Sequence, residues 1–268
     1  MKKSTYIYLL IFIFSIIDMK ASNIDYQING SKCDRVIRDI QFQALENELP
    51  QRPQDAQRIT SIQLNRLGLQ SVPNWVFCCK NLKILNLSHN KITALPEEIY
   101  LLSQLNELNI AANRKLTTIS NSICQLQKLE ILLMNSTTIK QLPAHLGDVI
   151  NLKHLNISST KIEEFPASFV QLKALQKLSM NNCSQFKVNT LPKELPSLKY
   201  FSASRMGWTC LPEAVFSWMP LEELNLSHNK ITDQLRIVQM KNENLDLFGN
   251  PRDPHLVEVL QRVGIEIK

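Results

Sequence analysis

Cysteine and histidine are the residues of this chain best suited to chemistry, because a thiolate can attack a substrate and an imidazole can move a proton or bind a metal. The cysteines are Cys33, Cys78, Cys79, Cys124, Cys183 and Cys210, and the histidines are His89, His145, His154, His228 and His255. None belongs to a spacing that such chemistry requires, since the sequence contains no CxxC pair, HExxH, GxSxG or Walker loop. We therefore predict that the chain is not an enzyme and needs no metal or cofactor.

The elements that position these residues form a tandem repeat. Its clearest copy is residues 82–104, LKILNLSHNKITALPEEIYLLSQ, in which alternating leucines are followed by an asparagine turn and a loosely helical return. The copies start at Ile59, Leu82, Leu105, Leu129, Leu152, Leu175, Leu198 and Leu221, spaced by 23 residues except for one spacing of 24. One copy cannot bury its own apolar edges, so the repeat predicts a solenoid in which each copy packs on its neighbours.

Composition and charge agree with a globular chain of ordinary size. Its 268 residues are 44% hydrophobic and 20% charged, and glycine is scarce at six residues, which argues against glycine-rich phosphate loops. The formal net charge of +6 is a mild excess, part of which comes from the first twenty residues. It is weak evidence for nucleic acid and is equally expected of a solvated surface.

The strand segments closely resemble the leucine-rich repeat family, in the form that carries Leu-Pro in the return segment. The signature reads LKILNLSHNKI at 82–92, LKHLNISSTKI at 152–162 and LEELNLSHNKI at 221–231. The resemblance covers about 59–251 and implies an α/β solenoid: a curved, right-handed superhelix with a parallel concave β-sheet and a short helical or irregular convex side. It also implies helical caps at both ends and non-catalytic protein binding.

The ninth position of each repeat is the turn residue, where an asparagine in this family satisfies buried backbone groups. The column reads Leu67, Asn90, Asn113, Thr137, Thr160, Cys183, Met206, Asn229 and Asn250. Leu67 and Met206 cannot make these hydrogen bonds, so we expect local irregularity in the first and seventh repeats. The return segment of the sixth repeat has an unusual length, so its outer loop is expected to bulge.

Function is expected on the strand positions that face away from the core, because side chains alternate along a strand and equivalent positions line up about 4.8 Å apart. The first column reads Ser61, Ile84, Glu107, Ile131, His154, Lys177, Tyr200 and Glu223. The second reads Gln63, Asn86, Asn109, Leu133, Asn156, Ser179, Ser202 and Asn225. Most of the second column is small polar filler, whereas Ile84, Ile131 and Leu133 place apolar groups on an open surface, where they are candidate contacts.

A second candidate cluster is basic and contains one aromatic residue. Its members are Lys153, His154, Lys177, Lys199, Tyr200 and Arg205. It would suit an acidic protein surface or a polyanion such as a glycan, but solvated charges that keep a long sheet soluble would look the same. One aromatic is a thin platform for stacking bases, so we expect no nucleic acid. The predicted partner-binding residues are Ile84, Glu107, Ile131, Leu133, His154, Lys177, Tyr200 and Arg205, on a chain expected to be a monomer.

The two ends are expected to differ from the repeats. Residues 1–22, with Lys2, Lys3 and an apolar run from Tyr6 to Ile17, predict a secretory signal peptide, or an uncleaved anchor that would tether the chain to a membrane. Residues 23–58 predict an N-terminal helical cap, residues 59–251 eight repeats plus a degenerate ninth, and residues 252–268 a C-terminal capping helix.

The predicted export of the chain and the predicted reduced state of its cysteines do not agree readily. We interpret the cysteines as small buried thiols rather than a disulfide framework, because Cys79 replaces a core leucine and Cys183 a turn asparagine. Reduced thiols sit awkwardly with export, although the lysine-led leader favours a bacterial-type exported protein in the medium or cell envelope. A cytoplasmic or membrane-anchored location remains an alternative. So does an effector-like protein that recruits or regulates an enzyme, for example in the ubiquitin pathway.

Overall fold

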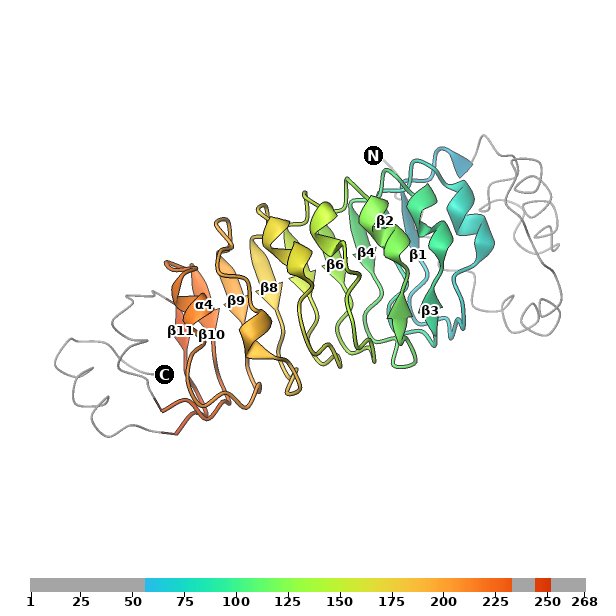
Figure 1. Cartoon of the computed structure of the whole chain (residues 1–268). Helices are drawn as coiled ribbons and strands as arrows, with labels where there is room; N and C mark the ends of the chain where they lie inside the picture. Colours follow the sequence, from blue (N-terminus) through green and yellow to red (C-terminus); the bar gives the residue numbers. More distant parts are fainter. Residues whose placement is uncertain (1–55, 233–243, 252–268) are drawn as a thin grey trace, which may run out of the picture.

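The protein is a single solenoid built around one parallel sheet. The computed structural model describes residues 56–232 and 244–251. Nine strands form one sheet and pair in the order in which they occur in the chain, and two further strands form a small separate sheet (Figure 1). The nine are β1 (Ser61–Gln63), β2 (Ile84–Asn86), β4 (Glu107–Asn109), β6 (Ile131–Leu133), β7 (His154–Asn156), β8 (Lys177–Ser179), β9 (Tyr200–Ser202), β10 (Glu223–Asn225) and β11 (Leu245–Asp246). The predicted solenoid with a parallel sheet is confirmed.

Short helical turns cover the opposite side of the solenoid, as Figure 1 shows. They are η1 (Asn74–Cys78), η2 (Glu97–Leu101), η3 (Asn121–Gln125), η4 (Leu146–Asp148), η5 (Ala167–Gln171), η6 (Val188–Thr190) and α4 (Glu213–Phe216). Most follow a proline that sits in an extended conformation just before the turn, which explains the recurring Leu-Pro pair. The small sheet pairs β3 (Ala94–Leu95) with β5 (Thr118–Ile119).

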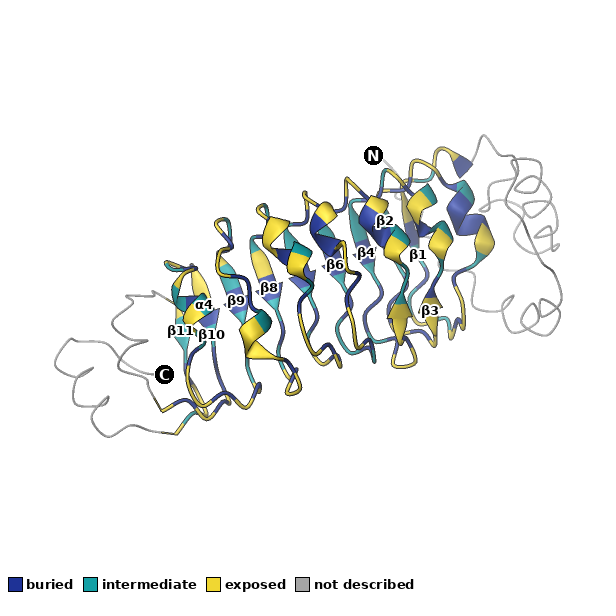
Figure 2. Ribbon diagram, viewed as in Figure 1, coloured by how far each residue is buried: buried dark blue, intermediate teal, exposed yellow. Residues whose placement is uncertain are grey.

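The core runs along the solenoid between the sheet and the turns, and Figure 2 shows buried residues, in dark blue, recurring from coil to coil. In the large sheet, the central residue of each of the eight three-residue strands is buried, and its two neighbours lie toward the open face. Those central residues are Ile62, Leu85, Leu108, Leu132, Leu155, Leu178, Phe201 and Leu224. Burial of these aliphatic side chains, stacked coil on coil, is the main stabilisation that the repeat provides.

At four of the turns, an asparagine side chain joins the turn to the coil before it. Asn90 Oδ1 accepts hydrogen bonds from the N–H groups of Leu67 and Leu69, at 2.9 and 3.1 Å. Its Nδ2 donates to the carbonyls of Leu64 and Leu87, at 2.7 and 2.8 Å. Asn113, Asn229 and Asn250 bridge neighbouring coils in the same way. These bonds satisfy buried amides that the tight turn would otherwise leave unpaired.

The first and seventh turns are irregular, as predicted from Leu67 and Met206. In each, a glycine follows the non-asparagine residue in the left-handed region, with φ of 72° at Gly68 and 76° at Gly207. No other described repeat has a left-handed residue at this position. The N–H of Met206 donates to Asn229 Oδ1 of the next coil at 2.9 Å, and Met206 Sδ itself accepts a hydrogen bond from the Cys183 N–H at 3.4 Å, so the expectation that Met206 cannot make such a bond is wrong.

The sixth repeat differs from the others on the convex side. Its one helical turn, η6, lies before Leu191 and Pro192 rather than after them. The row of outer turns is therefore interrupted between η5 and α4, and a groove of about 710 Å³ opens there. Its lining includes Val188, Leu191 and Trp208. The unusual segment lengths predicted a bulge here, and the structure adds that the rearranged loop leaves a cavity.

Several predicted segments lie outside the described residues. They are the signal peptide of 1–22, the helical cap of 23–58 except for its last three residues, and the capping helix of 252–268. Within 56–232 and 244–251, no helix combines the length and the apolar character that crossing a membrane requires.

Candidate functional site: the concave sheet face

The register of the sheet builds the two columns that the repeat predicts. Ile84 pairs with Glu107, Glu107 with Ile131, Ile131 with His154, His154 with Lys177 and Lys177 with Tyr200. The second column is aligned by the same ladder, so that Asn109 pairs with Leu133 and Leu133 with Asn156. The concave face is defined here as the surface formed by these two columns and the residues that immediately precede them.

The candidate contact residues are not all neighbours. Ile131 and Leu133 flank buried Leu132 on β6, and both are half-buried. Ile84 lies two strands away, with Glu107 between it and Ile131, so the three predicted apolar residues do not form one patch. Glu107 and Ile84 are half-buried as well. The apolar surface is therefore centred on β6 alone.

Arg205 lies in a turn rather than on a strand. It follows β9 with φ of 55°, and its N–H donates to the Ser227 carbonyl at 3.1 Å. Its exposed side chain leaves from the edge of the sheet. Lys177 is also exposed, whereas its neighbours on the two adjacent strands, His154 and Tyr200, are half-buried.

Half of the second column has a structural task. The Oδ1 atoms of Asn86, Asn109, Asn156 and Asn225 each accept a hydrogen bond from the N–H two residues later, at 3.0 to 3.1 Å. These bonds fix the turn that leaves the strand, as short polar side chains do elsewhere. Leu133 occupies the same column and cannot accept a hydrogen bond.

The basic cluster predicted from the sequence is largely neutralised, because two of its lysines are paired. Lys153 Nζ lies 2.9 Å from Glu130 Oε2, and Lys199 Nζ lies 2.7 Å from Glu222 Oε1. Hydrogen bonding to Lys199, and then to Tyr200, lowers the pKa of Glu222, while the bond to Glu222 raises the pKa of Lys199. Among the described residues, Lys177 and Arg205 are the members of the cluster with a permanent positive charge that form no ion pair.

Lys177 is the lysine of the cluster that lacks a carboxylate partner among the described residues. Its Nζ lies over the ring of Tyr200, 5.7 Å from the centroid. The Tyr200 hydroxyl donates to Glu222 Oε2, and this bond raises the pKa of the phenol. The ring is thus held in place by Glu222, and the ring in turn positions the ammonium group.

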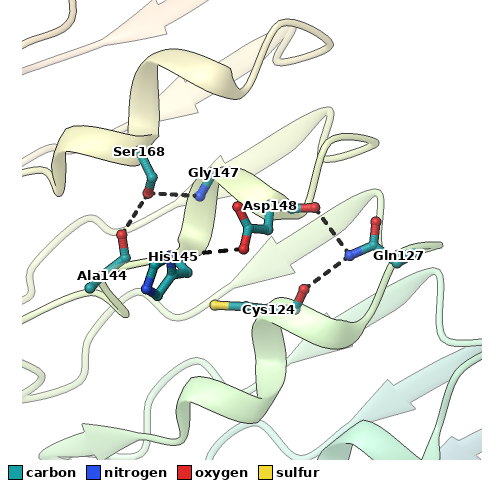
Figure 3. A network of polar contacts seen from close by, with 7 residues as sticks. All are labelled: Cys124, Gln127, Ala144, His145, Gly147, Asp148 and Ser168. Carbon is teal, nitrogen blue, oxygen red and sulfur yellow. Dashed lines mark hydrogen bonds and ion pairs between the residues drawn. The ribbon is translucent and has the colours of Figure 1, made fainter.

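One Cys, His and Asp lie on adjacent outer turns, and their environment does not suit catalysis (Figure 3). His145 Nδ1 is 3.9 Å from Asp148 Oδ2, on η4, and Cys124 lies on η3. Burial, and secondarily the charge of Asp148, raises the pKa of the Cys124 thiol to about 11. A catalytic cysteine needs a lowered pKa, because the thiolate is the nucleophile.

Other contacts in Figure 3 hold these turns together. Gly147 N–H donates to Ser168 Oγ at 3.1 Å, and Ser168 Oγ donates to the Ala144 carbonyl at 2.7 Å. Gln127 Nε2 donates to the carbonyls of Cys124 and Asp148, at 3.0 and 3.1 Å. The network therefore serves packing between consecutive outer turns.

No metal centre forms in the part of the chain that the structure describes: no group of three or more His, Cys, Asp or Glu side chains there could hold an ion. Cys79 is fully buried, and burial raises the pKa of its thiol to about 12. Cys79, Cys124 and Cys183 are buried free thiols, and Cys210 is an exposed one.

The interpretation of the cysteines as thiols is wrong for Cys78. This residue is disulfide-bonded, whereas the four other described cysteines are free. The sequence holds one further cysteine, Cys33. The pattern could not reveal the bond, because Cys78 sits in η1 without a nearby second cysteine except Cys79, which packs into the core.

Two functional neighbours were missed from sequence alone, Glu130 and Glu222. Each lies 23 residues from the lysine that it pairs with, Lys153 and Lys199 respectively, which is one repeat length. Because equivalent positions stack, opposite charges one repeat apart face each other across adjacent strands. That spacing is the signal that would have predicted both ion pairs.

Comparison with known proteins agrees with this geometry. Models described as leucine rich repeat match residues 57–114 and 80–139, 151–172, and 219–234. The chain is therefore similar to the leucine-rich repeat family over these residues. Its relatives include a plant intracellular Ras-group-related leucine-rich repeat protein of Oryza sativa, 29% identical over 54% of this chain and 40% of that protein. Another is osteomodulin of Rattus norvegicus, 27% identical over 69% of this chain and 44% of that protein.

Solved leucine-rich repeat structures share the fold. A leucine-rich repeat protein of Leptospira interrogans is 25% identical, with a TM-score of 0.52, over 78% of this chain and 65% of that one. An internalin of Listeria monocytogenes is 20% identical, with a TM-score of 0.57, over 87% of this chain and 74% of that one. The chain spans less than half the length of the two relatives from rice and rat.

Proposed function

We propose that this leucine-rich repeat protein is a non-catalytic scaffold that binds a protein partner on its concave face. The observation that carries the proposal is Leu133. It is a half-buried leucine in a column where four equivalent residues are asparagines that stabilise their own turns. A leucine here contributes nothing to the turn and leaves apolar surface open, which is what a contact residue requires.

A protein partner fits the charges better than a polyanion does. Lys153 and Lys199 form ion pairs with Glu130 and Glu222, so fewer free cations remain to bind a polyanion. An apolar centre with a mixed polar rim is the usual composition of a protein interface. The bacterial-type exported location and the monomeric state belong to the same proposal.

Export is supported by two independent features. The N-terminal residues have the basic and apolar segments of a secretory signal. Cys78 is disulfide-bonded, and disulfides persist mainly in oxidising compartments. Peptide mapping of the purified protein without reduction should recover Cys78 in a cross-linked peptide, and a Cys33→Ser variant should release its thiol. Alkylation of Cys78 in unreduced wild-type protein would contradict this.

The binding proposal is tested by capture with concave-face variants. Wild-type protein and single alanine variants of Ile131, Leu133, Tyr200 and Arg205 are immobilised at equal density and exposed to the proteins of the native environment. Proteins retained by wild type are identified by mass spectrometry, and their affinities are then measured with each variant. A contact residue at an interface centre costs about 2 kcal/mol or more on truncation, so at least one variant should lose about 30-fold in affinity.

Val170→Ala is the matched control. Val170 lies on η5, on the convex side, and its side chain is exposed. Its truncation should leave every retained protein bound as to wild type. Equal retention by wild type and all four concave variants would rule out the concave face as the binding surface.

A further inference from the structure

Leu133 is placed on the concave face at a cost to the fold. In the neighbouring repeats, the N–H groups of Ala111 and Ser158 are each capped by the asparagine two residues earlier, at 3.1 and 3.0 Å. The corresponding N–H here belongs to Asn135, and it donates no hydrogen bond to any described residue. The fourth repeat therefore gives up one hydrogen bond and keeps an aliphatic side chain beside Ile131.

A positioned cation lies on the same face, toward the C-terminal end. The ammonium of Lys177 rests over the Tyr200 ring, whose hydroxyl is bound by Glu222. Glu222 is itself occupied by Lys199 at 2.7 Å. Lys177 is thus oriented by a neutral ring and is not neutralised by a carboxylate. A cation held in this way can bind an incoming anion with little loss of side-chain freedom.

The separation of the two features limits what can bind both. β6 and β8 are two strands apart, and the Lys177 ammonium extends toward β9. With strands about 4.8 Å apart, the apolar patch and the ammonium are separated by about 10 to 14 Å. An extended peptide that crosses the strands covers this distance in about three or four residues, at roughly 3.3 Å per residue.

We infer that the concave face recognises an extended, acidic protein segment. It would seat one large apolar side chain against Ile131 and Leu133, and direct an aspartate or glutamate, three or four residues away, to the Lys177 ammonium. The segment would match the concave face through one apolar contact and one ionic contact. The apolar patch and the Lys177 ammonium are both in position before binding. This partner chemistry rests on the proposed function and makes it more specific.

The test is selection of a random 12-residue peptide library, displayed on phage, against the immobilised full chain. Wild type should enrich peptides in which an apolar residue and an acidic residue are three or four positions apart. Leu133→Asn restores the residue type of the neighbouring repeats, so it should fold at least as stably as wild type and yet lose these peptides by about tenfold or more. Lys177→Glu should reverse the preference and enrich basic residues at the same distance.

The outcomes separate the two levels of the proposal. Peptides that depend on Leu133 but carry no acidic residue, or bind Lys177→Glu unchanged, overturn the acidic segment and leave concave-face binding intact. Peptides that bind wild type, Leu133→Asn and Lys177→Glu equally overturn both. The absence of any enrichment over blank beads overturns recognition of a linear segment, while the capture experiment with folded proteins decides the proposed function. A Leu133→Asn variant with a lowered melting temperature would contradict the assignment of Leu133 to binding.

Discussion

Asn90 provides the sharpest quantitative test of how the coils are joined. Its side chain makes four good hydrogen bonds, to the N–H groups of Leu67 and Leu69 and to the carbonyls of Leu64 and Leu87. A net contribution of about 1 kcal/mol each gives a loss of about 4 kcal/mol for Asn90→Ala, since all four groups would stay buried without partners. That is a large part of the stability of a typical domain.

Asn90→Thr is the graded variant, because the protein itself uses threonine at this position in other coils. Thr137 and Thr160 each donate one hydrogen bond to the carbonyl three residues earlier, at 2.9 and 2.7 Å. Threonine at position 90 should therefore retain one of four bonds and lose about 3 kcal/mol. Asn86→Ala is the control on the same coil. Asn86 is half-buried, its Oδ1 caps one N–H and its Nδ2 donates to Gln63 Oε1 at 2.8 Å, so about 1 to 2 kcal/mol is expected.

The assay is urea unfolding followed by tryptophan fluorescence and circular dichroism, with hydrogen exchange of the Leu67 and Leu69 amides as the local readout. A loss of 4 kcal/mol corresponds to exchange about a thousandfold faster, provided that exchange requires the same opening. The expected order of stability loss is Asn90→Ala, then Asn90→Thr, then Asn86→Ala. Equal losses for Asn90→Ala and Asn86→Ala would refute the role assigned to the buried asparagine.

Three further outcomes are expected. Gly147→Ala should lower the unfolding free energy by about 2 kcal/mol or more in a urea titration, because a Cβ there would lie 1.9 Å from the Ser168 carbonyl oxygen. A Gly147→Ala variant as stable as wild type would contradict this packing. Iodoacetamide at pH 7.4 should label exposed Cys210 in the native protein and spare buried Cys124, whose pKa is raised to about 11. Equal labelling of both cysteines by mass spectrometry would show that Cys124 is not buried. Wild type should be more stable than Glu222→Gln at pH 7, and this difference in unfolding free energy should disappear as pH falls below about 4.5. The reason is that the pKa of the Glu222 carboxylate is lowered in the folded state. Urea titrations across pH that show a constant difference would exclude the ion pair as its cause.

The fold could be predicted from the sequence because its period fixes its geometry. A spacing of 23 residues sets which residue of one coil faces which residue of the next, and the observed partners Ile131 and His154 follow from that alone. The irregular turns at Leu67 and Met206 were also predictable, since neither side chain can replace the full set of asparagine hydrogen bonds, although Met206 Sδ accepts one from the Cys183 N–H. The glycines that accommodate them, Gly68 and Gly207, carry positive φ in the structure.

The features that could not be predicted from the sequence depend on side-chain and loop conformation. The ion pair of Lys153 with Glu130 follows the repeat spacing, but whether two long side chains meet depends on their rotamers. The position of Lys177 over Tyr200 is linked in turn to the hydrogen bond of Tyr200 to Glu222, so that two contacts connect three residues from three consecutive repeats. The convex groove required knowledge of where η6 would form within a loop of unusual length.

The most direct test of the central claim compares two asparagine substitutions on opposite faces. Leu133→Asn alters the concave face and restores the residue of the neighbouring repeats, while Val170→Asn alters the exposed convex side. The equilibrium affinity of each for a protein captured by the wild-type chain is measured by biolayer interferometry. We predict a loss of about tenfold or more for Leu133→Asn, equal to about 1.4 kcal/mol, and no change for Val170→Asn. Unchanged affinity for Leu133→Asn, with a loss for Val170→Asn, would place the binding surface on the convex side and contradict the account.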